Sequence, residues 1–123
     1  MGSNFPQKEN TIAFNKSCNQ QVANAVKDCI DNGDGILLSL TDFENQFKYN
    51  KFYIDSCFTS CFGISLIAYR NIKRMEVSRE LLKLNHSVTV VAERVGYKSL
   101  YAFSRAYKKM YGASPTKDMK QFE

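Results

Sequence analysis

From residue 19 onward, apolar side chains recur three or four positions apart, which is the spacing of an amphipathic helix. Between about 19 and 31 this spacing predicts a first helix, and the polar, glycine-rich run 31–35 ends it. After Leu40 the pattern stays helical to the end of the chain. Residues 1–17 are polar without any such period, and we interpret them as a flexible lead or as residues added for expression. The pattern therefore predicts an all-α domain over residues 18–122.

Capping residues divide the middle of the chain into three helices. The first is short and begins at Ser39 or Thr41, either of which can accept a hydrogen bond from the backbone at a helix start. The second covers about 51–62. The third covers about 66–84 and, at 1.5 Å per residue, is about 28 Å long. The residues that set these boundaries are Asn50, Gly63 and Ser65.

The same order of caps and stops recurs in the last third of the chain. A short helix is predicted after Ser87, a second after Ser99 and a third after Ser114. The third begins with a proline, which is tolerated at the first helical position because its missing N–H would be unpaired there. Gly96 lies in the turn between the first two helices, and Gly112 ends the second.

These two parts of the chain are copies of one unit. From Asn50 to Ser65 each residue pairs with the one 49 positions later, so that Gly63 aligns with Gly112; upstream of Asn50 the offset is 48. The repeated unit is a short helix, a tight turn, a capped helix and a glycine stop. That order is a duplicated helix-turn-helix.

In a helix-turn-helix the second helix enters the DNA major groove and contacts base edges with its N-terminal part. We therefore expect the residues opposite the buried face of each second helix to contact DNA. They are Lys51, Phe52, Asp55 and Ser56 in the first unit, and Leu100, Tyr101, Ser104 and Arg105 in the second. Arg105 is favoured because its fork of donors suits guanine or phosphate, whereas Leu100 is explained equally well as a solvent-facing position.

Charge is concentrated in the C-terminal part of the chain. The net charge is +5; residues 1–50 carry four lysines against six acidic residues, and residues 51–123 carry 13 basic residues against six acidic ones. A basic half on a small domain is expected of a polyanion-binding protein, although a basic surface that only maintains solubility explains the charge equally well. The residues assigned to phosphate contacts are Lys98, Lys108 and Lys109.

Catalytic and metal-binding chemistry has little support. Four cysteines without a C-x-x-C pair and the single His86 do not make a zinc site, and the run 31–35 lacks the final carboxylate of a calcium loop. No phosphate loop, dinucleotide fingerprint or nucleophile–base pair occurs. We therefore expect no enzyme activity, no metal and no cofactor. Without a signal peptide or an apolar run of about 20 residues, the protein is expected to be cytoplasmic, nucleoid-associated when bound to DNA, and not in a membrane.

The second unit resembles the DNA-binding signature of the AraC/XylS family of bacterial transcription regulators. Register is kept through both units and the helix between them, over about residues 36–122. The matching residues are Ser87-Val88-Thr89, Val91-Ala92, Val95-Gly96-Tyr97, Ser99, Phe103-Ser104-Arg105-Ala106-Tyr107-Lys108-Lys109, Tyr111-Gly112 and Ser114-Pro115, with Gly63-Ile64-Ser65, Tyr69, Arg74-Met75 and Leu81-Leu82 upstream.

The resemblance implies two helix-turn-helix subdomains joined by a long linker helix, about seven helices in all. The first unit would cover about 36–65, the linker helix about 66–84 and the second unit about 87–122. It further implies sequence-specific binding to double-stranded DNA, with two recognition helices in successive major-groove segments, and activation of transcription through RNA polymerase. Family members commonly carry a separate N-terminal effector or dimerisation domain, so we expect either an excised C-terminal domain or a stand-alone member.

Departures from the family pattern cluster in the first unit. Lys48 stands where the family has a turn glycine, at a cost of roughly 1 kcal/mol if its backbone is left-handed. Leu66 replaces the usual proline, Arg70 an apolar residue and Ser78 a small alanine. Asp55 could accept from cytosine, but phosphate would repel it. We therefore expect weak or unusual reading by the first unit. The residues expected to supply most of the affinity are Lys98, Arg105, Lys108 and Lys109.

The main alternative is a helical protein-interaction module that has lost DNA affinity. The acidic Asp55 and the aromatic Phe52 and Tyr101 on the predicted reading faces favour this interpretation. The basic residues of the second unit favour DNA.

Overall fold

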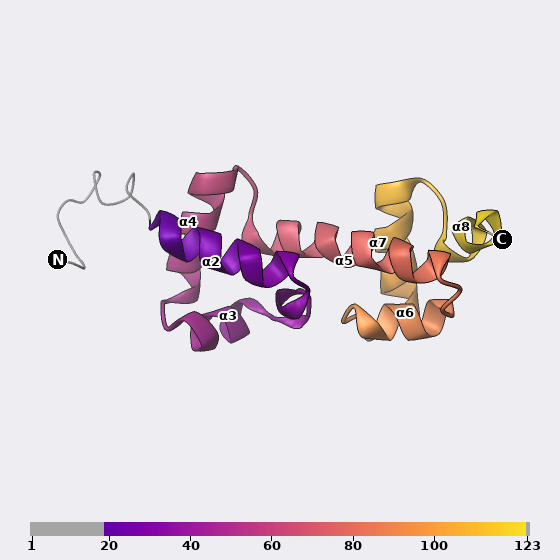
Figure 1. Ribbon diagram of the computed structural model, residues 1–123, viewed down its shortest axis with the longest axis horizontal. Helices are drawn as coiled ribbons and strands as arrows, with labels where there is room; N and C mark the ends of the chain where they lie inside the picture. Colours follow the sequence, from indigo (N-terminus) through magenta and orange to yellow (C-terminus); the bar gives the residue numbers. More distant parts are fainter. Residues whose placement is uncertain (1–18, 123) are drawn as a thin grey trace. The chain divides into compact units, whose positions relative to one another are not determined.

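The computed structural model describes residues 19–122, which form seven α-helices and one short 3-10 helix, with no strand among them (Figure 1). The all-α prediction is thus confirmed. The lead predicted for residues 1–17 lies outside the described residues. The chain divides into two compact units, with the boundary between Ala68 and Tyr69.

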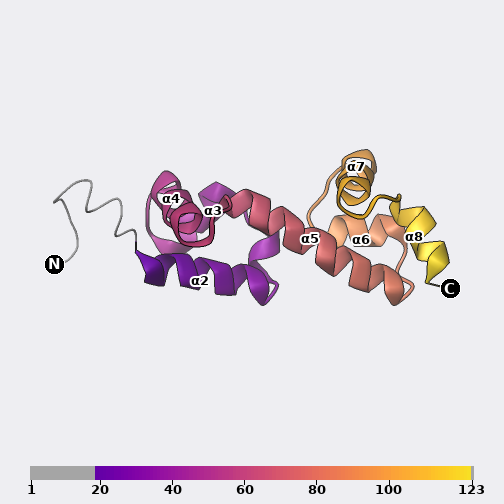
Figure 2. The ribbon, with the colours of Figure 1, turned by 90° about the horizontal axis from the view of Figure 1, so that it is seen from above.

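The first unit contains α2 (Gln20–Asp31), η1 (Asp34–Leu37), α3 (Leu40–Phe47), α4 (Lys51–Phe62) and the first turn of α5 (Leu66–Lys83). Helix α2 packs across α4 and also contacts η1 and α3 (Figures 1 and 2). Every one of these elements contributes apolar side chains to the core. The buried residues include Val26, Ile30, Ile36, Phe43, Ile54, Phe58 and Leu66.

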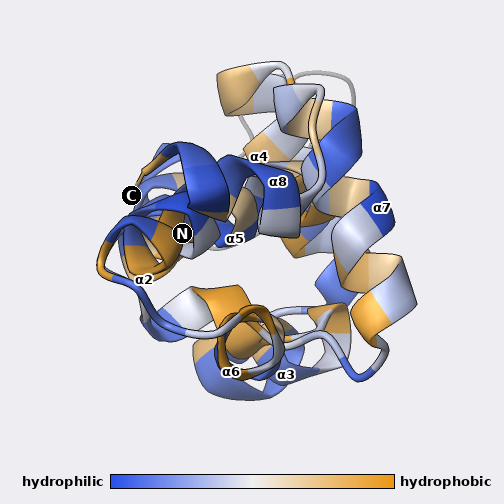
Figure 3. Ribbon diagram, turned by 90° about the vertical axis from the view of Figure 1, so that its right-hand side faces the viewer, coloured by the Kyte–Doolittle hydropathy of each residue, from blue (hydrophilic) through white to orange (hydrophobic). Residues whose placement is uncertain are grey.

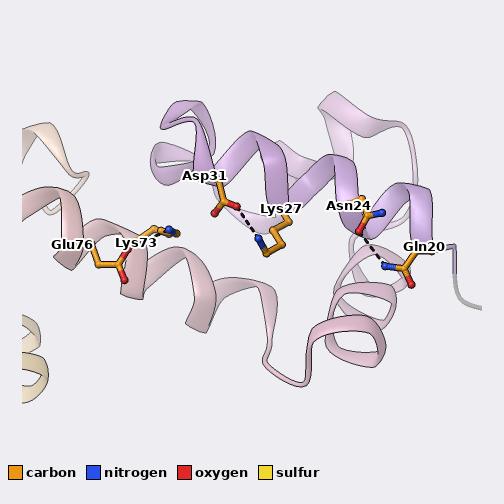
Figure 4. Close-up of polar contacts among 6 residues, drawn as sticks. All are labelled: Gln20, Asn24, Lys27, Asp31, Lys73 and Glu76. Carbon is orange, nitrogen blue, oxygen red and sulfur yellow. Dashed lines mark hydrogen bonds and ion pairs between the residues drawn. The ribbon is translucent and has the colours of Figure 1, made fainter.

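Two polar pairs, each one helical turn apart, lie on α2 (Figure 4). Lys27 Nζ is 2.8 Å from Asp31 Oδ2, and Gln20 Nε2 donates to Asn24 Oδ1 over 3.0 Å. Solvent-accessible pairs of this kind contribute only about 0.2–0.5 kcal/mol each. The buried face of α2, which includes Val26 and Ile30, therefore holds the helix in place.

The second unit contains the rest of α5 together with α6 (Val88–Arg94), α7 (Leu100–Tyr111) and α8 (Pro115–Gln121). Helix α7 packs against both α6 and α8. The buried apolar residues come from all four helices and the turn after α6. They include Met75, Leu82, Val91, Val95, Phe103, Tyr107 and Pro115.

A buried polar cluster connects α7, α8 and α5 within the second unit. Tyr107 OH donates to Asp118 Oδ2 over 2.6 Å, and Arg79 Nε lies 3.6 Å from the same carboxylate oxygen. The Arg79 guanidinium also lies over the ring of Tyr111, 4.6 Å from its centroid. Burial and the neighbouring Asp118 raise the pKa of Tyr107, which keeps its hydroxyl protonated as a donor. This cluster fixes the short α8 against α7, because a buried carboxylate is stable only when it is paired.

Side-chain caps begin the helices where the sequence predicts. At α3 the acceptor is Ser39 rather than Thr41: Ser39 Oγ accepts from Asp42 N–H, and the Asp42 carboxylate accepts from Ser39 N–H, which is a capping box. The other described caps are Asn19, Asn50, Ser65, Ser87, Ser99 and Ser114. Gly63 and Gly112 end α4 and α7 in the left-handed conformation, as expected.

Asp55, which the sequence analysis predicted to contact DNA, instead caps the start of α5. Asp55 Oδ1, on α4, accepts from the N–H of Leu66, the first residue of α5, over 2.9 Å. In the second unit the aligned residues are Ser104 and Pro115. Proline has no N–H, so that unit needs no such acceptor. The first unit therefore has Leu66 where the family has proline, and Asp55 provides the acceptor that the Leu66 N–H needs.

The turn between α3 and α4 contains a strained residue. Lys48 takes the left-handed conformation, with φ 66°, where the second unit has Gly96. A side chain in this conformation costs roughly 1–2 kcal/mol. We expect Lys48→Gly to raise the free energy of unfolding by about 0.5–1 kcal/mol, the remainder being lost to the greater freedom of glycine when unfolded. Urea unfolding followed by circular dichroism measures the change.

Gly63 provides the reverse control. Its φ is 73° and nothing lies within 4 Å of an added Cβ, so Gly63→Lys should cost a similar amount through backbone strain alone. A loss of stability in Lys48→Gly would show that the lysine side chain, and not the backbone, determines the energy of this turn.

Removing the Asp55 carboxylate should leave the Leu66 N–H without its acceptor. We expect Asp55→Ala to lower the free energy of unfolding by about 1–2 kcal/mol, and Asp55→Asn by less because the amide oxygen can still accept. The matched variant is Ser104→Ala: the residue aligned with Leu66 in that unit is Pro115, which has no N–H, so stability should change by no more than about 0.5 kcal/mol. Equal losses for Asp55→Ala and Ser104→Ala in urea unfolding would refute this role.

Candidate nucleic-acid interface

The outward face of α7 begins directly after its Ser99 cap. Tyr101 is 71% exposed and Leu100 47% exposed, whereas Ser104 is half-buried. Arg105 is exposed one turn after Tyr101, and its guanidinium lies over the Tyr101 ring, 5.6 Å from the ring centroid. Because the stacked aromatic restricts the guanidinium, Arg105 presents its donors in a partly fixed geometry.

Basic side chains continue this face. Lys98, in the turn before α7, is exposed, as are Lys108 and Lys109 in its last turn. The two later lysines and Arg105 line one shallow depression together with Ala102 and Ala106. Figure 3 shows hydrophilic segments along α7 interrupted by hydrophobic ones, as expected of a helix with one buried and one exposed face. Lys108 and Lys109 also lie near the negative C-terminal end of α7, which stabilises their charge.

The outward face of α4 has a different chemistry. Phe52 is 69% exposed and Ser56 is also exposed, but neither charged residue of the helix is free. Lys51 is half-buried; its Nζ lies 3.3 Å from Thr41 Oγ1 and 5.7 Å from the centre of the Phe52 ring. The carboxylate of Asp55 is engaged by the start of α5. The first unit thus exposes an aromatic ring and hydroxyl groups where the second exposes arginine and lysine.

A second acceptor at the start of α4 was not apparent from the sequence. Glu44 Oε1 accepts from the N–H of Lys51 over 2.7 Å, while Asn50 Oδ1 accepts from the N–H of Phe52. In the repeat, Glu44 aligns with Ala92, which is buried. The sequence signal for this acceptor was the glutamate at a position where the other unit has alanine. Together the two acceptors fix the orientation of the first turn of α4.

In the second unit a side chain of α5 packs against the turn that precedes α7. The guanidinium of Arg74 lies 5.4 Å from the ring centroid of Tyr97, the residue after Gly96. Desolvation, and secondarily the charge of Arg74, lowers the pKa of Arg70 to about 10, so that Arg70 remains charged at neutral pH; Arg70 Nη2 donates to Asn71 Oδ1 over 2.8 Å. Arg70 stands where the family has an apolar residue, and its charged guanidinium is accommodated by the hydrogen bond to Asn71.

Among residues 19–122, no three His, Cys, Asp or Glu side chains lie close enough together to hold a metal ion. Within the same part of the chain, no single helix is long and apolar enough to cross a membrane. The bent pair α4 and α5 passes that test by length and composition only, a test that buried core helices also pass.

Comparisons with known proteins agree with the duplicated helix-turn-helix. A family model described as "Helix-turn-helix domain" matches residues 44–121. The chain is 28% identical over 108 residues to the Msm operon regulatory protein of Streptococcus mutans, covering 87% of this chain and 39% of that protein. It is 30% identical over 81 residues to the multiple antibiotic resistance protein MarA of Escherichia coli, covering 65% of this chain and 64% of that protein. The chain therefore spans less than two thirds of the length of these relatives.

A solved structure shares the fold. The C-terminal domain of AraT, a response regulator from Geobacillus stearothermophilus, superposes with a TM-score of 0.74 at 27% identity, over 81% of this chain and 84% of that domain. The family model covers most of the chain, including α4, α7 and the helix between them. The chain belongs to the AraC family of helix-turn-helix DNA-binding transcription regulators.

Proposed function

We propose that this domain reads double-stranded DNA with α4 and α7, each inserted into one of two successive major-groove segments, as the reading part of a transcription activator. The observation that supports it most is on α7: Arg105 is exposed, stacked on Tyr101 and flanked by Lys108 and Lys109. Arginine held in this way can donate two hydrogen bonds to guanine O6 and N7, the commonest specific contact in the major groove.

The residues of the second unit divide into base contacts and backbone contacts. Leu100, Tyr101, Ser104 and Arg105 lie in the first half of α7, which is the part of a recognition helix that reaches the bases. Lys98 and the two lysines at the end of α7 flank that segment and are assigned to phosphates. Phosphate contacts supply affinity and fix the orientation of the helix, but they carry no sequence information directly.

In the first unit we retain Lys51, Phe52 and Ser56 as DNA contacts and assign Asp55 to positioning. Its carboxylate already accepts from the N–H of Leu66, and a free carboxylate at this place would be repelled by phosphate. This engagement also removes Asp55 from the features that favoured a protein-interaction module.

Partners beyond DNA are proposed from the family and from the share of a longer relative that this chain covers. RNA polymerase is the expected partner of an activator of this family. A separate effector or dimerisation segment is proposed because the chain spans only 39% of the Msm operon regulatory protein.

The function is tested by binding to random double-stranded DNA at increasing salt, followed by selection of the tightest sequences. We expect affinity to fall steeply with salt because each neutralised phosphate releases a counterion. Selected sites should contain two short blocks about one helical turn, or about 34 Å, apart. A single block would reduce α4 to a backbone contact, and the absence of salt-sensitive binding would favour the protein-interaction module instead.

Arg105 and Lys108 should respond differently to removal. We expect Arg105→Ala to cost about 1–3 kcal/mol of binding free energy and to relax the preference at one base position. Lys108→Ala should weaken binding to all sequences alike and reduce the slope of log affinity against log salt by about 1. Both residues are exposed, so neither substitution should change folding. An unchanged sequence preference in Arg105→Ala, or a loss confined to one sequence in Lys108→Ala, would reverse these assignments.

A further inference from the structure

The two reading helices carry an exposed aromatic residue at the same place. Phe52 is the second residue of α4 and Tyr101 the second residue of α7, and they align in the repeat. Their exposed fractions are 69% and 71%, whereas Phe43, Phe58 and Phe103 are fully buried. An exposed aromatic ring at the N-terminal end of a proposed recognition helix is available for contact with a base, and its burial on contact is favourable.

One turn further along, the two units differ. The second unit has Arg105 over its aromatic ring, whereas the first has the exposed Ser56. The only charged residues of α4 are Lys51 and Asp55, which are bonded to Thr41 and to the start of α5. Apart from Lys51, whose ammonium lies against Thr41 and the Phe52 ring, the face that α4 presents to a groove carries the Phe52 ring and the Ser56 hydroxyl and has no guanidinium.

The Phe52 ring and the Ser56 hydroxyl together match the major-groove edge of thymine. In the major groove thymine alone presents a C5-methyl group, next to its O4 acceptor; Phe makes apolar contact with the methyl group, and a Ser hydroxyl can donate to O4. We propose that the first unit reads thymine, with Phe52 against the methyl group and the Ser56 hydroxyl available to O4 of the same or a neighbouring base pair. This inference rests on the proposed function, and it gives the two half-sites different compositions, one thymine-containing and one guanine-containing.

Lys51 and the N-terminal contacts of α4 support this use of the ring. The Lys51 ammonium lies 5.7 Å from the centre of the Phe52 ring, and the backbone N–H of Phe52 is held by Asn50 Oδ1 over 2.8 Å. The ring is thus carried on a fixed first turn. A fixed apolar group discriminates a methyl group better than a mobile one, because less freedom is lost on contact.

The experiment removes only the methyl group. A duplex containing a site selected by the full chain is prepared with each thymine in turn replaced by deoxyuridine, and the affinity of each duplex is measured. The block whose preference relaxes in Arg105→Ala belongs to the second unit, so the other block is that of the first. At one or two positions of that block we expect deoxyuridine to weaken binding about fourfold, the value for one buried methyl-sized group.

Phe52→Ala should bind more weakly overall but should no longer distinguish thymine from uracil at those positions. The matched variant Tyr101→Ala should retain the fourfold ratio, because it alters the aligned ring of the other unit. Circular dichroism melting of Phe52→Ala checks folding, which the exposed side chain should not affect.

Two outcomes overturn the inference while leaving the proposed function intact: tight, sequence-specific binding with no deoxyuridine effect in the first block, or an effect that persists in Phe52→Ala. In the second case the methyl group is sensed by another residue or through DNA shape. The absence of any salt-sensitive DNA binding by the unaltered chain would overturn the proposed function itself, and this inference with it.

Discussion

Every helix in this domain starts with backbone N–H groups that have no acceptor inside the helix, and side-chain oxygens provide the acceptors. Six of the seven α-helices among residues 19–122 have twelve residues or fewer, a length at which an isolated helix is marginal in water. Caps such as Ser39, Asn50 and Ser99 therefore fix where each helix begins. The starts of α4 and α7 in turn determine which side chains face outward, and so the proposed interface depends on the caps.

The two units show how one structural problem is solved twice. At the start of the helix after the glycine stop, the second unit uses a proline that has no N–H, and the first uses Leu66 with Asp55 as its acceptor. At the turn, the second unit uses Gly96, and the first uses Lys48 in a left-handed conformation. In the first unit, the carboxylates of Asp55 and Glu44 thus accept from the backbone at the starts of α5 and α4.

The second unit keeps its internal charges apart from its exposed ones. The partly exposed Arg79 pairs with the buried Asp118, and the buried Arg74 lies against the Tyr97 ring. Arg105, Lys108 and Lys109 remain on the outer face of α7. Stacking on the Tyr101 ring already restricts the Arg105 guanidinium. Arg105 would therefore lose less side-chain conformational entropy on contacting a base. The proposed interface thus combines a guanidinium that stacks on an aromatic ring, assigned to a base, with exposed lysines assigned to phosphates.

The sequence by itself determined the helices, their caps, the glycine stops and the duplication, because periodicity and capping are local and involve residues only a few positions apart. It also identified the exposed face of α7, since the buried face of an amphipathic helix fixes the opposite one. The tertiary structure decided what local patterns do not contain: that Asp55 turns to Leu66, that Glu44 holds the N–H of Lys51, and that Tyr107 pairs with Asp118. Each of these bonds joins different helices, and a side chain chooses between solvent, DNA and a backbone partner only when the fold has brought that partner within hydrogen-bonding distance.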